Sequence, residues 1–262
     1  MQLDTIDHKE IKKEFARVQG MEEFIDLMLE YFHRYSSEKY SERLEIQVPG
    51  LSKTYGTPVP VLSAIAGYVA EFLHKDASLG ILLLKKLWDR GSREERRVAC
   101  EALGELFRMD SKQAHRLAMN WMADLDNWEI CDALALDGYR PFAEENTLTA
   151  LRHSTTLVKS PNPWIRRFGI VSLIPVVPLI PGEGIGVFLD ILKGVMKDPD
   201  ENVQKAVAWL LRELSPRDRF RVEKFLDYYS KKPSPSTRYI LREGSRKLPP
   251  DRRKLIMEKM SQ

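Results

Sequence analysis

Apolar residues recur every three or four positions along most of the chain, which is the spacing of one face of an α-helix. The clearest example covers residues 200–215, where the apolar positions are Val203, Val207, Leu210 and Leu214. At roughly 100° of rotation per residue these four side chains share one stripe. The pattern predicts an amphipathic helix that packs this stripe against a core.

The same spacing predicts short helices over nearly all of the remaining chain, separated by glycine- and proline-containing breakers. The predicted segments are 8–18, 21–36, 58–75, 77–91, 93–109, 111–125, 126–136, 145–159, 162–174, 183–197, 217–232, 236–248 and 251–260. Residues 36–58 are the longest stretch expected to be irregular, and residues 138–141 are expected to form a turn. No segment alternates convincingly between apolar and polar residues, so no sheet is expected.

Three of the predicted helix starts carry capping signals. Asp110 and Ser111 precede one helix, Asn162 followed by Pro163 opens another, and the Asp-Pro-Asp sequence at 198–200 precedes the helix described first. Paired helices with a period of about forty residues are typical of HEAT-like repeats. We therefore expect a single all-α domain over 1–262, a HEAT-like solenoid of stacked antiparallel helix pairs with a concave basic face.

Composition narrows the class of protein. With 262 residues, 43% of them apolar, the chain is long enough for one large domain or an elongated array. No apolar run could span a bilayer, and the polar start does not resemble a signal peptide, so we expect a soluble cytoplasmic protein without a membrane partner. Cys100 and Cys131 lie in helical patterns and are expected to be reduced thiols. The histidines are scattered singly, so neither a metal site nor a cofactor is expected.

The charge is unevenly distributed along the chain. Residues 201–262 contain 16 Lys and Arg against 8 Asp and Glu, whereas residues 1–200 contain 25 against 30. A basic C-terminal quarter indicates a polyanionic partner such as nucleic acid, although a solubilising surface would have the same composition.

Two tryptophans lie away from the predicted apolar stripes. Trp209 falls between Lys205 and Arg212 on the face of 200–215 that is opposite the stripe, and Trp128 lies one turn before Asp132 in the segment 126–136. Each ring is either a partly buried wedge between helices or part of a binding surface.

Nucleotide-binding P-loop, HExxH, CxxC and GxSxG patterns in the required context are absent from the sequence. What remains resembles the AlkD-like DNA glycosylases, a HEAT-like all-helical family, over about residues 55–248. The blocks that carry the resemblance are, in order, YGTPVPVLSAIA, LWDRGSREERRVACEAL, DNWEICDALA, NPWIRRFGIV and QKAVAWLLRE.

The resemblance implies an enzyme that hydrolyses the N-glycosidic bond of positively charged N3- or N7-alkylated purines in duplex DNA, acting as a monomer in base excision repair. It implies that Asp132 is the catalytic carboxylate and that Trp128 and Trp209 are cleft tryptophans. It assigns Arg167 and Arg212 to the DNA backbone. The chain before Tyr55 is spaced differently from the family's pattern, so the family's aromatic residue at the cleft edge is not assigned, and Tyr40 and Tyr55 are the candidates for it.

Two further cations are candidate DNA contacts. Lys205 lies beside Trp209, and Arg166 lies in a helix that is apolar nearly all round, where a charge must be paired either with a phosphate or with an internal Asp or Glu. The competing interpretation of the whole chain is a non-catalytic HEAT-like scaffold that binds a DNA structure or a protein partner. A carboxylate beside an aromatic ring in a basic cleft favours the enzyme, because a pure nucleic-acid binder gains little from it.

Overall fold

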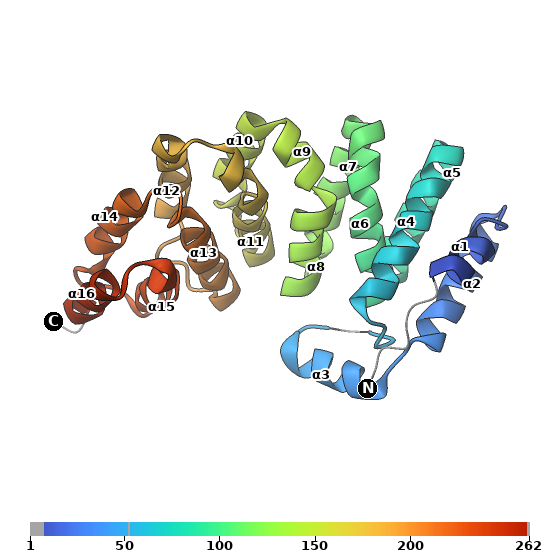
Figure 1. Cartoon of the computed structure of the whole chain (residues 1–262), viewed down its shortest axis with the longest axis horizontal. Helices are drawn as coiled ribbons and strands as arrows, with labels where there is room; N and C mark the ends of the chain where they lie inside the picture. Colours follow the sequence, from blue (N-terminus) through green and yellow to red (C-terminus); the bar gives the residue numbers. More distant parts are fainter. Residues whose placement is uncertain (1–7, 52, 261–262) are drawn as a thin grey trace. The chain divides into compact units, whose positions relative to one another are not determined.

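The computed structural model describes residues 8–51 and 53–260 of the chain (Figure 1). Residues 1–7, 52 and 261–262 lie outside the described part, and with them lie the predicted irregular Ser52 and the two ends of the predicted domain over 1–262. Among the described residues there are helices and turns and no strands, as the apolar spacing predicted. No described helix is long and apolar enough to cross a membrane.

The elements follow one another with short connections. The α-helices are α1 (His8–Phe15), α2 (Met21–Arg34), α3 (Glu38–Gln47), α4 (Val59–Lys75), α5 (Ala77–Arg90), α6 (Arg93–Met109), α7 (Ser111–Trp121), α8 (Trp128–Ala133), α9 (Arg140–Glu145), α10 (Thr147–Leu157), α11 (Pro163–Val171), α12 (Gly186–Lys193), α13 (Glu201–Leu214), α14 (Arg219–Ser230), α15 (Pro235–Gly244) and α16 (Pro250–Met260). Tighter 3-10 turns cover Met122–Asp124, Ile174–Leu179, Gly182–Ile185 and Ser245–Lys247, and a π-helical turn covers Leu134–Gly138.

Helix starts are fixed by side-chain caps. The predicted caps are confirmed: the Asp110 carboxylate accepts from the Gln113 backbone N–H, the Asn162 amide oxygen accepts from Trp164, and Asp200 accepts from Asn202 and Val203. Each such contact satisfies an N–H that has no partner inside the helix, and replacing a capping residue by alanine typically costs about 1 kcal/mol.

Two segments that were predicted to be non-helical contain helices. The stretch 36–58 contains α3, which begins after the Ser37 cap and buries only Leu44; with one apolar anchor it shows little of the periodicity that marks other helices. The predicted turn at 138–141 ends early, because Arg140 and Pro141 already belong to α9. Proline is tolerated in a first turn, where its missing N–H would have no partner.

The chain forms two compact units, the first ending at Tyr139 and the second beginning at Arg140. In the first unit α6 is central and packs against α4, α5, α7 and α8. In the second, α13 packs against α11 and α15, while α12 packs against α10 and α14, and α14 packs against α16 (Figure 1). The second unit therefore has two layers, α11, α13 and α15 in one and α10, α12, α14 and α16 in the other, as expected of a helical repeat.

The apolar stripe of α13 lies in the core of the second unit. Val203, Val207, Leu210 and Leu214 on α13 are all fully buried. Burying a side chain of this size stabilises the fold by about 1.5–3 kcal/mol. Gly244 of α15 allows the two helices to approach, because a Cβ there would lie 3.0 Å from a methyl carbon of Leu211. The opposite side of α13 is left for polar and aromatic residues.

Candidate active site and nucleic-acid interface

Trp128 and Asp132 lie one turn apart on the short helix α8. The Asn127 side chain caps this helix by accepting from the Ile130 backbone N–H at 3.0 Å, so Trp128 is its first residue. Ile130 and Cys131 are buried, whereas Trp128 and Asp132 are half-buried. The sequence-predicted pair therefore shares the less buried side of α8.

A π-helical turn directly follows the end of α8. It spans Leu134–Gly138, and the Gly138 position lies so close to α6 that a Cβ there would be 2.9 Å from the Cys100 carbonyl oxygen. Single π-helical turns are rare and are frequent at functional sites. This turn ends the α8 segment one turn after Asp132, and its tight approach to α6 holds that end in place.

The orientation of Trp128 is fixed from the N-terminal side. Its indole N–H donates to the Gln47 carbonyl oxygen at the end of α3, at 3.0 Å. Gly50 then brings the chain against the start of α8: its φ is +91°, and a Cβ there would lie 2.7 Å from the Asp126 carbonyl oxygen. A residue with a side chain would be both strained and obstructed at this position. The helix missing from the sequence prediction, α3, is thus the element that holds the ring.

A buried ion pair between Arg93 and Glu129 anchors α8 to α6. Arg93, the first residue of α6, is fully buried, and its guanidinium donates to both carboxylate oxygens of Glu129, at 2.7 and 2.8 Å. It also donates to the Thr57 carbonyl oxygen at 3.0 Å. Burial lowers the pKa of Arg93, but the hydrogen bond and charge of Glu129 outweigh it and the net pKa is raised. Glu129 lies between Trp128 and Asp132 in sequence, so this pair sets the position of α8.

The neighbouring Glu94 organises the loop that precedes α4. Its carboxylate accepts from the Thr54 hydroxyl at 2.8 Å and from the backbone N–H groups of Tyr55 and Thr57, at 3.0 and 3.2 Å. Glu95 completes a capping box with Ser92. The acidic and basic residues at the start of α6 look like a solvated charge run in sequence, yet they are buried and bonded.

The two tyrosine candidates for the cleft edge have different surroundings. Tyr40 on α3 lies against the buried arginine, with its hydroxyl 3.4 Å from an Arg93 nitrogen. Tyr55 packs edge-on against the His33 ring, with ring centroids 5.2 Å apart. Tyr40 therefore contacts Arg93 with its own side chain, whereas Tyr55 joins the same network through its backbone N–H, which donates to Glu94.

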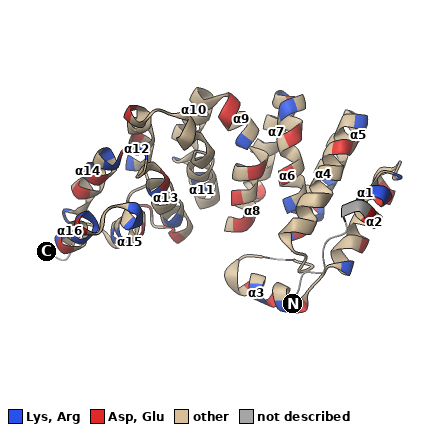
Figure 2. Cartoon of the chain, viewed as in Figure 1, with Lys and Arg blue, Asp and Glu red and all other residues tan. Residues whose placement is uncertain are grey.

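In the second unit, α13 carries the other predicted group. Trp209 is half-buried and Lys205 is half-exposed, with its ammonium 3.9 Å from Glu201. Arg212 is half-buried, and its guanidinium donates to the Glu243 carbonyl oxygen at 3.3 Å. All three follow the side of the helix opposite its buried stripe. Figure 2 shows further Lys and Arg on the helices that follow, α14 to α16.

Arg166 and Arg167 on α11 have internal partners. The Arg166 guanidinium forms a two-point ion pair with Asp198, at 2.7 and 2.9 Å, which is the internal carboxylate that the sequence analysis left open. Arg167 is buried and donates to the Asn202 carbonyl oxygen at 2.6 Å. Both arginines therefore hold α11 to the start of α13.

Other functional chemistry is limited in the part of the chain that the structure describes. No group of His, Cys, Asp or Glu there is arranged to hold a metal ion. Cys100 and Cys131 are buried free thiols, as the helical patterns predicted, and burial raises the pKa of Cys100, which keeps it protonated and unreactive.

A comparison with family models matches residues 28–248 to the DNA alkylation repair enzymes. The chain belongs to this family. The match begins before residue 55, where the resemblance in sequence was placed, and so includes α3 and the contact between Gln47 and Trp128. It covers both tryptophans and Asp132, and it supports an enzymatic role in the repair of alkylated DNA.

A solved structure with a similar fold is the predicted DNA alkylation repair enzyme from Enterococcus faecalis. It shares 16% sequence identity with the chain, at a TM-score of 0.65, with 82% of this chain and 97% of that one covered. At this identity the likeness shows the shared all-helical fold. No protein among the curated sequences matches the chain.

Proposed function

We propose that this member of the DNA alkylation repair family is a DNA glycosylase that hydrolyses the N-glycosidic bond of positively charged N3- or N7-alkylated purines in duplex DNA. The observation that carries the proposal is the half-buried carboxylate of Asp132, one turn from Trp128 on a helix whose position is fixed by a buried ion pair. A rigidly placed charge is what stabilisation of a short-lived cation requires.

The chemistry needs few protein groups. In an alkylated cationic purine the electron pair of the C1′–N bond passes to the base, which leaves neutral and without protonation. The sugar develops positive charge at C1′, a water adds there, and the water loses a proton. The products are an abasic site and the free alkylpurine.

Asp132 has two tasks in this scheme. Its negative charge stabilises the cationic sugar, and its oxygens accept hydrogen bonds from the attacking water and take up its proton. The chain positions the carboxylate through the Asn127 cap, the Arg93–Glu129 pair and the π-helical turn, so little reorganisation is needed during the reaction.

The tryptophans supply selectivity for a cationic lesion. The face of an indole attracts a positive charge by about 0.5–2 kcal/mol, depending on how far water is excluded. In the proposal the Trp128 ring contacts the cationic nucleotide beside Asp132, and the Trp209 ring on α13 offers the same attraction to a cationic group; an uncharged purine would lose this attraction. Most enzymes that act on a base rotate it into a deep pocket, whereas the family resemblance implies a cleft that addresses the sugar.

Lys205 and Arg212 are the principal phosphate contacts in this proposal. The Arg166 guanidinium is already held at two points by Asp198, and Arg167 is buried against Asn202. We therefore assign these two arginines chiefly to the placement of α11 and α13, with any phosphate contact secondary. Phosphate contacts confer no sequence preference, which suits an enzyme that must scan all DNA.

The decisive experiment is a base-release assay. The full chain is incubated with a duplex containing one 7-methylguanine, and abasic sites are then cleaved and counted. We expect cleavage above that of the same duplex without protein, and none with an unmodified guanine at that position. Binding of the duplex without release of the base would instead support a non-catalytic scaffold.

A further inference from the structure

A groove along α14 combines exposed aromatic rings with cations. Two adjoining hollows on its α12 side, of ≈ 520 and ≈ 590 Å³, share Lys193, Tyr228 and Tyr229 as walls. The first hollow extends to the loop after α14, where Lys231 and Lys232 lie. The groove belongs to the layer of α12 and α14, so it is formed by other helices than α13, which carries Trp209.

The groove has more cations than carboxylates. Lys193 pairs with Asp190 at 2.6 Å, and Asp190 is the one acidic residue among the described walls of the two hollows. Lys231 and Lys232 are exposed and form no ion pair with any described residue. Clustered like charges repel one another, and an anion in the groove would relieve that repulsion.

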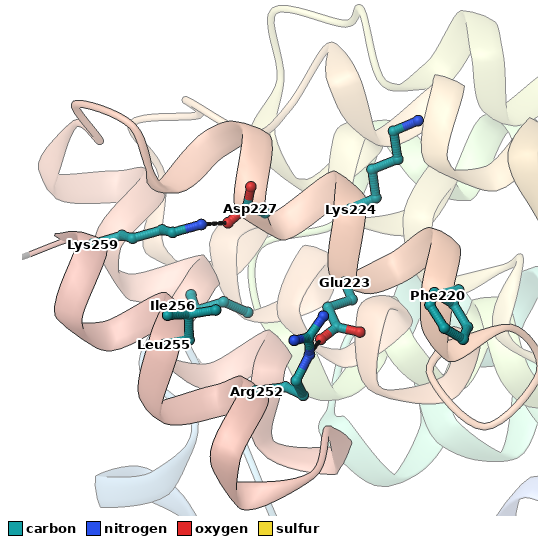
Figure 3. A pocket seen from close by; sticks show the side chains of 8 residues that line it. All are labelled: Phe220, Glu223, Lys224, Asp227, Arg252, Leu255, Ile256 and Lys259. Carbon is teal, nitrogen blue, oxygen red and sulfur yellow. Dashed lines mark hydrogen bonds and ion pairs between the residues drawn. The ribbon is translucent and has the colours of Figure 1, made fainter.

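In the hollow on the other side of α14, most of the cations are paired with carboxylates. Figure 3 shows Arg252 paired with Glu223 and Lys259 paired with Asp227 across α14 and α16. There two of the three cations are neutralised within the protein, and only Lys224 is directed away. Of the two sides of α14, the α12 side therefore has the larger excess of positive charge.

Tyr228 and Tyr229 line the groove together with these cations. Tyr229 packs against Phe225, with centroids 5.0 Å apart, and Tyr228 lies edge-on to Tyr229 at 5.1 Å and 85°. Tyr228 is nevertheless 70% exposed. An aromatic ring that is held by its neighbours but left uncovered is a stacking platform for a flat ligand.

The backbone at Lys232 supports a functional reason for its charge. This residue follows the C-cap of α14 and has a φ of +60°, the left-handed conformation in which helices usually place glycine. A side chain costs free energy there, and a glycine would end the helix better. A contact between the Lys232 ammonium and an anionic ligand would explain why a lysine occupies this position.

We infer that this groove binds single-stranded DNA, with a base stacked on Tyr228 and the backbone phosphates near Lys193, Lys231 and Lys232. Grooves that combine basic residues with aromatic rings are typical of single-strand binding, because every base has a face that can stack. In a duplex the bases are stacked on one another and cannot reach the ring. The inference does not depend on the glycosylase activity.

The first test measures binding of a fluorescently labelled dT12 oligonucleotide to the full chain by anisotropy. All variants are made in a Trp209→Ala background, which removes stacking on α13. Tyr228→Ala should weaken binding roughly tenfold, as loss of one stacked base does, and Tyr228→Phe should restore it. The matched control is Phe220→Ala, which removes a ring that is 73% exposed on the same helix but outside the groove. Equal affinities for Tyr228→Ala and Phe220→Ala would overturn the inference.

The second test uses the strained lysine. Lys232→Gly should raise the midpoint of thermal unfolding, because glycine adopts the backbone conformation freely, and should at the same time weaken dT12 binding. The slope of log affinity against log salt should fall by about 0.7 for one lost phosphate contact. Unchanged affinity and slope in Lys232→Gly, or displacement of dT12 by poly-glutamate as readily as by unlabelled dT12, would show that the groove is not a single-strand site.

Discussion

Asp132 is the residue on which the proposed chemistry depends. Substitution to Asn keeps the size and hydrogen bonding of the side chain but removes the charge that acts mainly in the transition state. We expect the single-turnover rate of 7-methylguanine release to fall by roughly 10²-fold, as for loss of one preorganised electrostatic stabiliser. Affinity for the duplex, measured by anisotropy, should hold or rise, because a negative charge near phosphates has gone.

The matched control is Asp89→Asn, the same change at an exposed position on α5 of the same unit. Its rate should equal that of the unsubstituted protein. Cationic lesions also depurinate spontaneously, so a more slowly depurinating lesion is measured beside 7-methylguanine. If Asp132→Asn releases both bases at the original rate, Asp132 is not the catalytic carboxylate.

Which residues share a helix face could be predicted from sequence, and their partners on other helices could not. Helical periodicity placed Trp128 with Asp132, and it placed Trp209 opposite the buried stripe of α13, because both depend on neighbours in sequence. The Asp198 partner of Arg166 and the Gln47 partner of Trp128 lie 32 and 81 positions away. Such contacts depend on how helices pack, which local spacing does not determine.

At the scale of elements, the Arg93–Glu129 pair joins α6 to α8. Arg93→Met would leave the Glu129 carboxylate buried without its main partner, and breaking a buried pair in this way costs about 3–5 kcal/mol. We expect a loss of this size in the free energy of unfolding measured with urea. The double variant Arg93→Met/Glu129→Leu should recover most of it, because apolar residues of similar volume often replace a buried pair without loss. If Arg93→Met alone is as stable as the unsubstituted protein, the pair does not anchor α8.

Two glutamates one turn apart on α6 have opposite pKa shifts. Burial raises the pKa of Glu101, the hydrogen bond from Ser63 lowers it, the charge of Asp137 raises it again, and the net pKa is raised. Burial also raises the pKa of Glu105, but hydrogen bonds from Arg108 and His74 outweigh it and the net pKa is lowered. The contributions of the two residues to stability should therefore have opposite signs at neutral pH.

These signs follow from proton binding. The folded protein holds the Glu101 proton at pH values where the unfolded chain has lost it, so this residue's contribution to stability falls as pH rises above about 4. Glu101→Gln should raise the thermal midpoint at pH 7 and lose that advantage in acid. Glu105 contributes stability above the same pH and loses it as pH falls, so Glu105→Gln should lower the midpoint at pH 7. Differential scanning calorimetry from pH 3 to 7 checks both, and equal shifts would contradict the electrostatic argument.

Most elements could be predicted, and the exceptions have physical reasons. The long helices carry enough apolar positions for their period to be read, and caps such as Asp200 mark their starts. Helix α3 buries only Leu44, so its sequence resembles that of a loop. The π-helical turn after α8 fits a close approach to α6 that leaves no pattern in the sequence itself.

At the scale of the whole molecule, the two compact units differ in charge as well as in content. The carboxylate proposed for catalysis lies in the first unit, and the basic C-terminal quarter lies wholly in the second. A single domain over 1–262 and a concave basic face remain predictions, because neither follows from the packing within one unit. The excess of cations in the second unit predicts that the affinity for a polyanion depends on the salt concentration.

The affinity for duplex DNA should fall steeply as salt rises. A protein that neutralises phosphates releases bound counterions, and each contact contributes about 0.9 to the slope of log affinity against log salt. Lys205 on α13 has a side chain that is 51% exposed and only a distant pairing with Glu201 at 3.9 Å, so its ammonium can reach a phosphate at small cost. Lys205→Gln should reduce the slope by about 1 and weaken binding to different sequences equally. Lys112→Gln, an exposed lysine on α7 of the first unit, is the control and should leave the slope unchanged. A flat salt dependence in the unsubstituted protein would show that phosphates are not its main partner, and the scaffold that binds a protein would then be the better account of the chain.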